Sequence, residues 1–317
     1  MATTQHDKEE RRRQERLEGE QGAAAAERRR TWWSYAGGAI LLVALLAGVI
    51  VLATGAGTEQ SPGAGAPSGA AAGGHVHGLG LTPSGDGVLI AAHNGLFRAP
   101  VGGGAPVQVS AEQQDFMGFT VASPERLLAS GHPAPGQNLP AALGLLESRD
   151  GGRTWQSVSL LGEVDFHVLR AAGERVYGFD GASGRLLASA DGGRTWQERP
   201  LPAPIFDLAI APGDPQRLIA ATEAGLVASR DGGRTWRLAG DAVGLLAWPS
   251  SAQLLVVDEQ GQVLSGAPGG RLSPRGALPE LPVTFMAARD ALYAALADGS
   301  VLRSVDGGAS WAAIARV

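Results

Sequence analysis

Short apolar runs divided by glycine- and proline-rich turns recur from residue 75 to residue 317. The runs come in pairs, and each has about the length of a β-strand. No part of this region keeps the 3.6-residue periodicity of an amphipathic helix, so the pattern predicts an all-β fold. The first runs of the six pairs are 75–81, 115–121, 165–170, 205–210, 242–248 and 284–288. The second runs are 88–92, 126–130, 175–179, 217–221, 253–257 and 291–295.

An eight-residue phrase, Ser-x-Asp-Gly-Gly-x-Thr-Trp, occurs three times among these runs and once more in a degenerate form, with Ser310 in place of Thr. The copies are 148–155, 189–196, 229–236 and 304–311, and their tryptophans are separated by 41, 40 and 75 residues. Gly-Gly supplies the positive φ angles of a hairpin turn, and the Asp side chain can accept hydrogen bonds from the N–H groups of that turn. The phrase therefore predicts a hairpin that leads into a strand beginning with Thr-Trp.

A fixed period of about 40 residues, carried by strand–turn–strand sequence, indicates a β-propeller. The six pairs predict six four-stranded blades over residues 75–317, and no run remains for a seventh. Blades one and five lack the phrase, because residues 101–106 and 267–271 stand in its place. Since no strand is left to be exchanged between the ends of this region, we expect the ring to close by packing between blades one and six.

The first 74 residues have a different character. Residues 1–31 form a charged tail with eight basic and seven acidic side chains, and residues 32–53 carry no charge. About 20 apolar residues in a helix span a bilayer, so 32–53 is predicted to be a transmembrane helix with Trp32, Trp33 and Tyr35 at its inner interface. Eight basic residues precede this span and none follows it before Arg98, which places the tail in the cytoplasm and the propeller outside it.

Residues 54–74 are mostly Gly, Ala, Pro and Ser, a composition typical of a flexible linker. The expected organisation is thus a single-pass protein of the cell membrane that carries an extracytoplasmic propeller. A cleaved signal peptide is the alternative, although the charged lead is long and no clear small-x-small cleavage site follows the apolar segment.

Composition narrows the choice of partners. The 317-residue chain has a net charge of −5 and no cysteine, which excludes disulfides and thiolate chemistry. A mildly acidic extracytoplasmic domain has no electrostatic reason to bind nucleic acid. The expected partners are the membrane, through the single span, and a small ligand, a glycan or a partner protein at the propeller.

Candidate metal ligands gather at the starts of the first runs, which line the central channel of a propeller. Aligning the six runs places these residues at one position: His77, Met117, His167, Asp207, Gly244 and Met286. His75 lies on the same strand face as His77, and His93 and His132 end second runs. Imidazole with thioether suits copper, and imidazole with carboxylate suits zinc. The alternative is that the methionines fill the core and the histidines bond strand ends.

Glycoside hydrolysis would require two carboxyl groups flanking the scissile bond, one of them able to hold a proton. Asp115, Asp165 and Asp207 are the candidates nearest the axis. Asp165 and Asp207 begin neighbouring blades, so they could face each other. The alternative is that all three are ordinary solvated acids at strand ends.

The eight-residue phrase resembles the Asp box, or BNR repeat, so residues 75–317 resemble a propeller group that includes sialidases, other glycosidases, photosystem-assembly-type propellers and sortilin-type receptors. Segments 75–81, 117–120, 130–133 and 165–168 resemble more specifically bacterial membrane-anchored BNR proteins described as glycosyl hydrolases. The resemblance implies a cell-surface glycoside hydrolase. Sialidases of this group also use an arginine triad and a Tyr–Glu pair. Here Arg170 is the one arginine on a first run, and Tyr177 and Tyr293 lie in second runs, which speaks against sialidase activity.

Together these features predict a binding module whose site is the mouth of the channel, formed by His77, His167, Met117, Met286 and Asp207. The ligand is expected to be a metal ion such as copper or zinc, a small molecule, or the loop of a partner protein. A surface glycosidase and an assembly factor without a small ligand remain as the alternatives.

Overall fold

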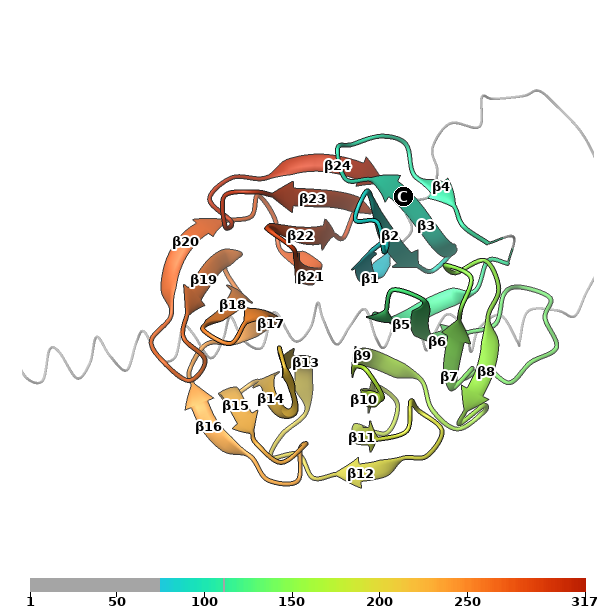
Figure 1. Cartoon of the computed structure of the whole chain (residues 1–317), viewed down its shortest axis with the longest axis horizontal. Helices are drawn as coiled ribbons and strands as arrows, with labels where there is room; N and C mark the ends of the chain where they lie inside the picture. Colours follow the sequence, from blue (N-terminus) through green and yellow to red (C-terminus); the bar gives the residue numbers. More distant parts are fainter. Residues whose placement is uncertain (1–74, 111) are drawn as a thin grey trace, which may run out of the picture. The chain divides into compact units, whose positions relative to one another are not determined.

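The computed structural model describes residues 75–110 and 112–317, which form six four-stranded antiparallel sheets set as blades around a central axis (Figure 1). Blades one to three are β1 (Val76–Leu81), β2 (Gly87–Ala92), β3 (Gly95–Pro100) and β4 (Val107–Gln108); β5 (Asp115–Ser123), β6 (Arg126–His132), β7 (Leu145–Ser148) and β8 (Gln156–Ser159); and β9 (Phe166–Ala172), β10 (Arg175–Asp180), β11 (Arg185–Ser189) and β12 (Gln197–Arg199). Blades four to six are β13 (Ile205–Ala211), β14 (Asp214–Thr222), β15 (Gly225–Ser229) and β16 (Arg237–Gly240); β17 (Gly244–Ser250), β18 (Gln253–Asp258), β19 (Gln262–Gly266) and β20 (Ser273–Ala277); and β21 (Pro282–Ala288), β22 (Ala291–Leu296), β23 (Ser300–Ser304) and β24 (Ala312–Arg316).

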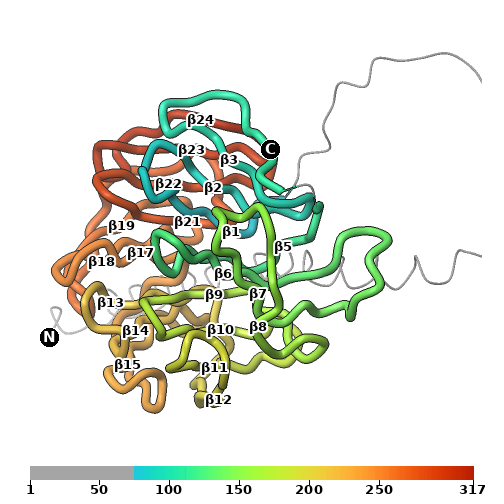
Figure 2. The backbone as a smooth tube through the Cα atoms, turned by 45° about the vertical axis from the view of Figure 1, so that its right-hand side comes forward, coloured from blue at the N-terminus to red at the C-terminus, as the bar shows by residue number. Residues whose placement is uncertain are grey.

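The first strand of each blade lies innermost and the fourth lies on the rim (Figure 1), and Figure 2 shows the same ring turned by 45°. Every predicted first and second run overlaps an observed strand, so the predicted six-bladed, four-stranded propeller is confirmed. Each sheet uses four consecutive strands, and the ring closes as expected without strand exchange. At the closure one apolar cluster joins Val76 and Ile90 of blade one to Tyr293 and Val301 of blade six.

Apolar clusters also fill the other spaces between neighbouring blades, and glycine permits the closest of these approaches. A Cβ atom on Gly118 of β5 would lie 2.3 Å from the backbone oxygen of Phe166 at the start of β9. Glycine at this point therefore lets the inner strands of blades two and three come together, beside the histidines described below.

The eight-residue phrases form the hairpins that their sequence predicts. In blade three, Oδ1 of Asp191 accepts hydrogen bonds from the backbone N–H groups of Arg194 and Thr195, and Oδ2 accepts one from the Thr195 hydroxyl. The Ser189 hydroxyl donates to Asp191 and accepts from the N–H of Gly193. These bonds, the Thr195 hydroxyl bond first, hold the pKa of Asp191 well below its ordinary value. The repeated acid is thus committed to its own turn.

The predicted tail, transmembrane span and linker lie outside the described residues. Among the residues that are described, no helix is long and apolar enough to cross a membrane.

Candidate metal centre

β-Bulges near the N-terminal ends of the inner strands set the positions of the candidate ligands. His77, Met117 and His167 are the extra residues of bulges in β1, β5 and β9. In each strand the two residues that flank the extra one pair with consecutive residues of the next strand. A bulge re-aims the side chain of its extra residue. The same position holds Phe206 in β13 and Val283 in β21.

This register corrects part of the sequence alignment. Asp207 lies one residue beyond the bulge of β13, opposite Ala221, and Met286 lies three residues beyond the bulge of β21, opposite Tyr293. Gly244 pairs directly with Asp258, and β17 has no bulge at this point. The apolar pattern could not reveal these offsets, because an apolar run does not begin at the same distance from the bulge in every blade.

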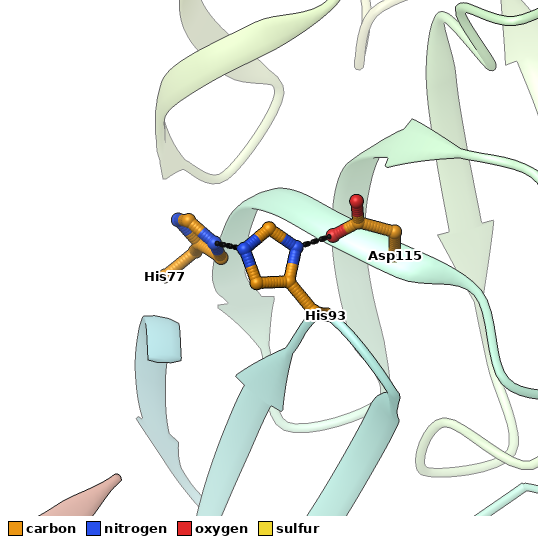
Figure 3. Close-up of side chains that lie close together, drawn as sticks. All are labelled: His77, His93 and Asp115. Carbon is orange, nitrogen blue, oxygen red and sulfur yellow. Dashed lines mark hydrogen bonds and ion pairs between the residues drawn. The ribbon is translucent and has the colours of Figure 1, made fainter. Parts of the chain in front are cut away.

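His77, His93 and Asp115 form one continuous row of contacts (Figure 3). The Nε2 atoms of His77 and His93 are 3.1 Å apart, and Nδ1 of His93 lies 2.6 Å from Oδ1 of Asp115. An ionised carboxylate can only accept, so His93 donates from Nδ1, and in the neutral form of the ring its Nε2 carries the lone pair. That lone pair points toward His77, at the place where a metal ion would be held.

The row continues through a second set of side chains. The other oxygen of Asp115, Oδ2, lies 3.2 Å from Nδ1 of His132, its direct cross-strand partner. Nε2 of His132 lies 3.3 Å from Oδ2 of Asp165, and the same oxygen lies 2.8 Å from Nε2 of His167. The row therefore runs from blade one through blade two to blade three, and each aspartate in it contacts two histidines.

His75 completes the set, since its ring meets the ring of His93 edge-on with centroids 5.6 Å apart. All five histidines of the described residues thus lie in this region, although sequence alone did not show how Asp115 and Asp165 connect them. The pairing of Asp115 with His132 across β5 and β6 was the signal available for that connection.

Charge along the row is divided unevenly. Hydrogen bonds to Asp115 and Asp165 raise the pKa of His132 to about 10, so His132 is a cation between two carboxylates. Burial, followed by the nearby charge of His93, lowers the pKa of His77 to about 4. Burial would raise the pKa of Asp115, but the bonds from His132 and His93 outweigh it and bring the value to about 2. Asp165 likewise has a pKa well below its ordinary value, because the bonds from His132 and His167 outweigh its burial.

The His77–His93–Asp115 group fits a metal ion. Each of the three residues offers a ligand atom, and these atoms lie within 4.8 Å of one another. Two nitrogens about 3.0–3.4 Å apart can share one zinc ion with bonds of about 2.0–2.1 Å. Asp115 could either join the ion or remain on Nδ1 of His93, as carboxylates behind metal-binding histidines commonly do. Met286 belongs elsewhere, since it packs against the core between blades one and six.

Asp207 occupies a different environment from Asp115 and Asp165. It is only 2% exposed, and its Oδ1 accepts from the N–H of Leu208 and from Nη2 of Arg170. Its Oδ2 accepts from the N–H of Leu246, at 2.8 Å. Asp207 therefore ties blades three, four and five together, and it keeps Arg170 from serving as a free anion-binding arginine.

Deeper in the ring, the inner strands line a partly open pocket of about 400 Å³. Its lining includes Arg170, Trp248, Thr284 and Met286. The pocket is thus lined by residues of the inner strands, with the paired guanidinium of Arg170 among them.

No family model and no curated protein matches this chain. Among solved structures, it is similar to a chain of a nidogen/laminin complex, with 13% identity, a TM-score of 0.55 and coverage of 71% of this chain and 91% of that one. It is also similar to the GH74 xyloglucanase from Xanthomonas campestris, with 20% identity, a TM-score of 0.51 and coverage of 76% of this chain and 38% of the enzyme. YCF48 bound to D1 peptide matches with 20% identity and a TM-score of 0.44 over 62% of this chain and 67% of that one.

The chain has the fold of a β-propeller. At these identities the likeness concerns the fold alone, and the chain spans well under half the length of the xyloglucanase. Function must therefore be argued from the residues of the site.

Proposed function

We propose that this protein is a membrane-anchored, extracytoplasmic propeller that binds a transition-metal ion at the histidine end of its channel, with zinc as the best fit. The observation that carries the proposal is the 3.1 Å approach of the His77 and His93 Nε2 atoms, with Asp115 on the far nitrogen of His93. Histidine with carboxylate is the ligand set that zinc takes. The apolar segment 32–53, the charges before it and the Asp-box resemblance support the membrane and extracytoplasmic parts of the proposal.

Electrostatics favours the same site. A metal ion needs an unprotonated imidazole, and the lowered pKa of His77 keeps that ring neutral near pH 7. The negative charge of Asp115 would partly offset the charge of a bound cation. Farther along the row, the cation of His132 holds Asp115 from the opposite side, which fixes the orientation of the carboxylate.

A metal titration of the full-length chain tests this proposal. The protein is purified in detergent without a histidine tag, stripped with a chelator and titrated with Zn²⁺ and Cu²⁺ by calorimetry. We expect one ion per chain, binding lost in His77→Ala and in His93→Ala, and affinity reduced roughly 10- to 100-fold in Asp115→Asn if that carboxylate acts behind His93. His6→Ala, in the N-terminal tail, is the matched control and should bind normally. Absence of binding, or unchanged binding in a His77→Ala/His93→Ala double variant, would refute the site.

The membrane topology has its own test. Because the chain has no cysteine, a Leu238→Cys variant carries a single thiol at a position that is 71% exposed. We expect a membrane-impermeant maleimide to label it on intact cells. Protection of this thiol until the cells are lysed would contradict an extracytoplasmic propeller.

Glycoside hydrolysis gains less support from the geometry. A glycosidase requires one carboxyl group that holds a proton, usually through a raised pKa. Asp115 and Asp165 have lowered pKa values because histidines bond to them, and Asp207 is occupied by two backbone N–H groups and Arg170. None of the three candidate acids is placed to donate a proton to a sugar.

A further inference from the structure

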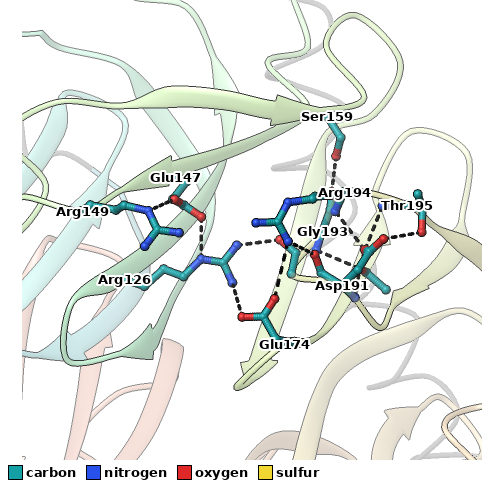
Figure 4. Close-up of polar contacts among 11 residues, drawn as sticks. Arg126, Glu147, Arg149, Ser159, Glu174, Asp191, Gly193, Arg194 and Thr195 are labelled. Atoms are coloured by element: carbon teal, nitrogen blue, oxygen red, sulfur yellow. Dashed lines mark hydrogen bonds and ion pairs between the residues drawn. The ribbon is translucent and has the colours of Figure 1, made fainter.

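The junction between blades two and three contains a network of arginines and glutamates in which the charges are paired (Figure 4). Arg126 is nearly buried, and its Nε donates to Glu147 over 2.5 Å while its Nη2 donates to the backbone oxygen of Gly192 over 2.6 Å. Glu174 lies 3.9 Å from Arg126 and 3.8 Å from Arg194. Arg149 also donates to Glu147. At this junction two carboxylates balance much of the arginine charge.

The junction between blades three and four repeats the same backbone. The N–H of Gly192 donates to the oxygen of Glu174, and in the next blade the N–H of Gly232 donates to the oxygen of Gln216. Gln216 therefore stands where the first junction has Glu174. In the same way Ala188, the cross-strand partner of Tyr177, stands where the first junction has Glu147, the partner of Leu128.

The second junction keeps arginines at the equivalent positions, although it has no carboxylate where the first junction has Glu147 and Glu174. Arg175 begins β10 as Arg126 begins β6, and Arg234 occupies the place of Arg194 in its eight-residue phrase. The second junction also has one more guanidinium. Arg199 of β12 lies three residues after Trp196, where β8 has Val158 three residues after Trp155. The second junction thus has three arginines and neither of the two glutamates.

Arg199 and Arg234 meet at the Gly232 turn, and Arg175 lies two residues before Tyr177, whose hydroxyl reaches the same turn. Arg199 is 8% exposed, and its Nε donates to the oxygen of Gly232 over 3.0 Å. A Cβ atom on Gly232 would lie 3.1 Å from the Tyr177 hydroxyl and 3.9 Å from a guanidinium nitrogen of Arg234. Burial, then the charges of Arg234 and Arg175, lower the pKa of Arg199. The like charges are therefore near enough to repel one another.

No carboxylate among the described residues lies within ion-pair distance of Arg175, Arg199 or Arg234. The other two nitrogens of Arg199 donate to neutral oxygens, those of the Glu198 backbone and the Gln197 side chain. Asp231 is nearby, but its carboxylate accepts from Arg234 N–H and Thr235 N–H within its own turn. Asp231 and Asp214 act on this junction at longer range. A buried guanidinium without a paired anion is costly, so this junction holds less negative charge than the first.

We propose that the junction between blades three and four binds a tetrahedral oxyanion, a phosphate or sulfate group, through Arg175, Arg199 and Arg234. Guanidinium groups present paired N–H donors that match the oxygens of such groups. The anion supplies the negative charge that Glu147 and Glu174 supply one blade earlier. It is either a free ion or an ester carried on a sugar, since both present the same oxygens.

Calorimetry on the full-length, chelator-treated protein at low ionic strength tests this site, because the chelator removes any metal-bound phosphate. The probes are inorganic phosphate, inorganic sulfate and glucose 6-phosphate. We expect one anion per chain, and tighter binding of glucose 6-phosphate than of phosphate would identify the sugar ester as the preferred source. Equal or weaker binding of the sugar ester would identify the free ion.

Two substitutions introduce the residues that stand at the equivalent positions of the first junction, so the same fold already holds them one blade earlier. Arg199→Val places the blade-two residue in β12, and Gln216→Glu restores a carboxylate beside Arg234. Each should weaken anion binding at least tenfold, and Gln216→Glu should do so without loss of thermal stability, because it pairs a free charge. Arg149→Ala, at the first junction, is the control and should leave binding unchanged. Failure of all three anions to bind at millimolar concentration, or unaltered binding in both variants, would overturn the proposal.

Discussion

Replacement of Asp207 by alanine should destabilise the propeller, because this carboxylate supports three blades. It accepts from Leu208 N–H at 2.7 Å within its own strand, from Leu246 N–H of blade five at 2.8 Å, and from Arg170 of blade three. Leu208 and Leu246 are 0% and 3% exposed, so water cannot easily replace the lost acceptor. The variant leaves two buried N–H groups without an acceptor and removes the carboxylate partner of the Arg170 guanidinium, which keeps its bonds to two backbone oxygens.

The magnitude follows from these three groups. A buried N–H that loses its acceptor costs about 1–3 kcal/mol, and two such groups set the scale of the loss. The Arg170 side chain is 30% exposed, so water partly screens its unpaired charge and its contribution is smaller. We therefore expect Asp207→Ala to lower the free energy of unfolding by about 3–5 kcal/mol. For a domain of this size that corresponds to a fall in Tm of roughly 10 °C.

Urea unfolding followed by tryptophan fluorescence measures the difference between variants. Asp207→Asn keeps the shape but turns one acceptor into a donor, so it should cost about 1–3 kcal/mol. Glu280→Ala, which removes an exposed acid, is the control and should stay within about 0.5 kcal/mol of the unaltered protein. If Asp207→Ala unfolds within about 1 kcal/mol of that protein, the structural role assigned to this carboxylate is wrong.

Three further predictions follow from the inner strands. Gly118→Ala would place a Cβ atom 2.3 Å from the backbone oxygen of Phe166, so it should lower the free energy of unfolding by about 1–3 kcal/mol in the same urea assay; an unchanged midpoint would show that the blades are not in contact there. His77 has a pKa of about 4 in the folded protein against 6.5 in an unfolded chain, so the unfolded state binds more protons between these values. Stability should therefore fall as pH drops from 6.5 to 4, by up to about 3 kcal/mol, and His77→Gln should flatten that slope; parallel pH profiles would contradict a neutral, half-buried His77. Nitrophenyl glycosides should not be hydrolysed, and turnover that disappears in Asp165→Asn would instead favour the glycosidase.

The repeat made the fold predictable from sequence. The positions of the site residues depended on the register of each inner strand, which the sequence did not show. Strand positions were correct because inner and second strands are apolar runs with glycine turns at fixed intervals. The assignment of Asp207 and Met286 to the His77 position failed because the aligned runs start at different points relative to the bulge. Run 205–210 begins one residue before its bulge, run 75–81 begins two residues before its bulge, and run 284–288 begins one residue after its bulge. The nearness of His93 and His132 to the channel histidines was expected, since second strands end where first strands begin.

The roles of the acids could not be assigned from sequence. Asp115, Asp165 and Asp207 stand at similar points of successive blades, yet two contact histidines and the third contacts backbone N–H groups and an arginine. A carboxylate takes its role from whatever donor the neighbouring blade presents. The arginine junction was missed for the same reason, because Ala188, Arg199 and Gln216 come from three different strands and meet only when blade four packs against blade three.

Differences between the blades, more than the repeat itself, determine where chemistry can occur in this ring. The repeated acids, such as Asp150, Asp191 and Asp231, are all occupied in closing their own hairpins, so they hold the blades in shape and leave little to bind a ligand. At the bulge position, blades one and three carry histidine, while blades four and six carry Phe206 and Val283. A metal ion at the channel would therefore bind on one side of the axis, against blades one to three. The hairpins and the apolar clusters hold the blades, so other residues can vary from blade to blade. Both proposed sites lie where that variation has placed unlike residues at equivalent positions.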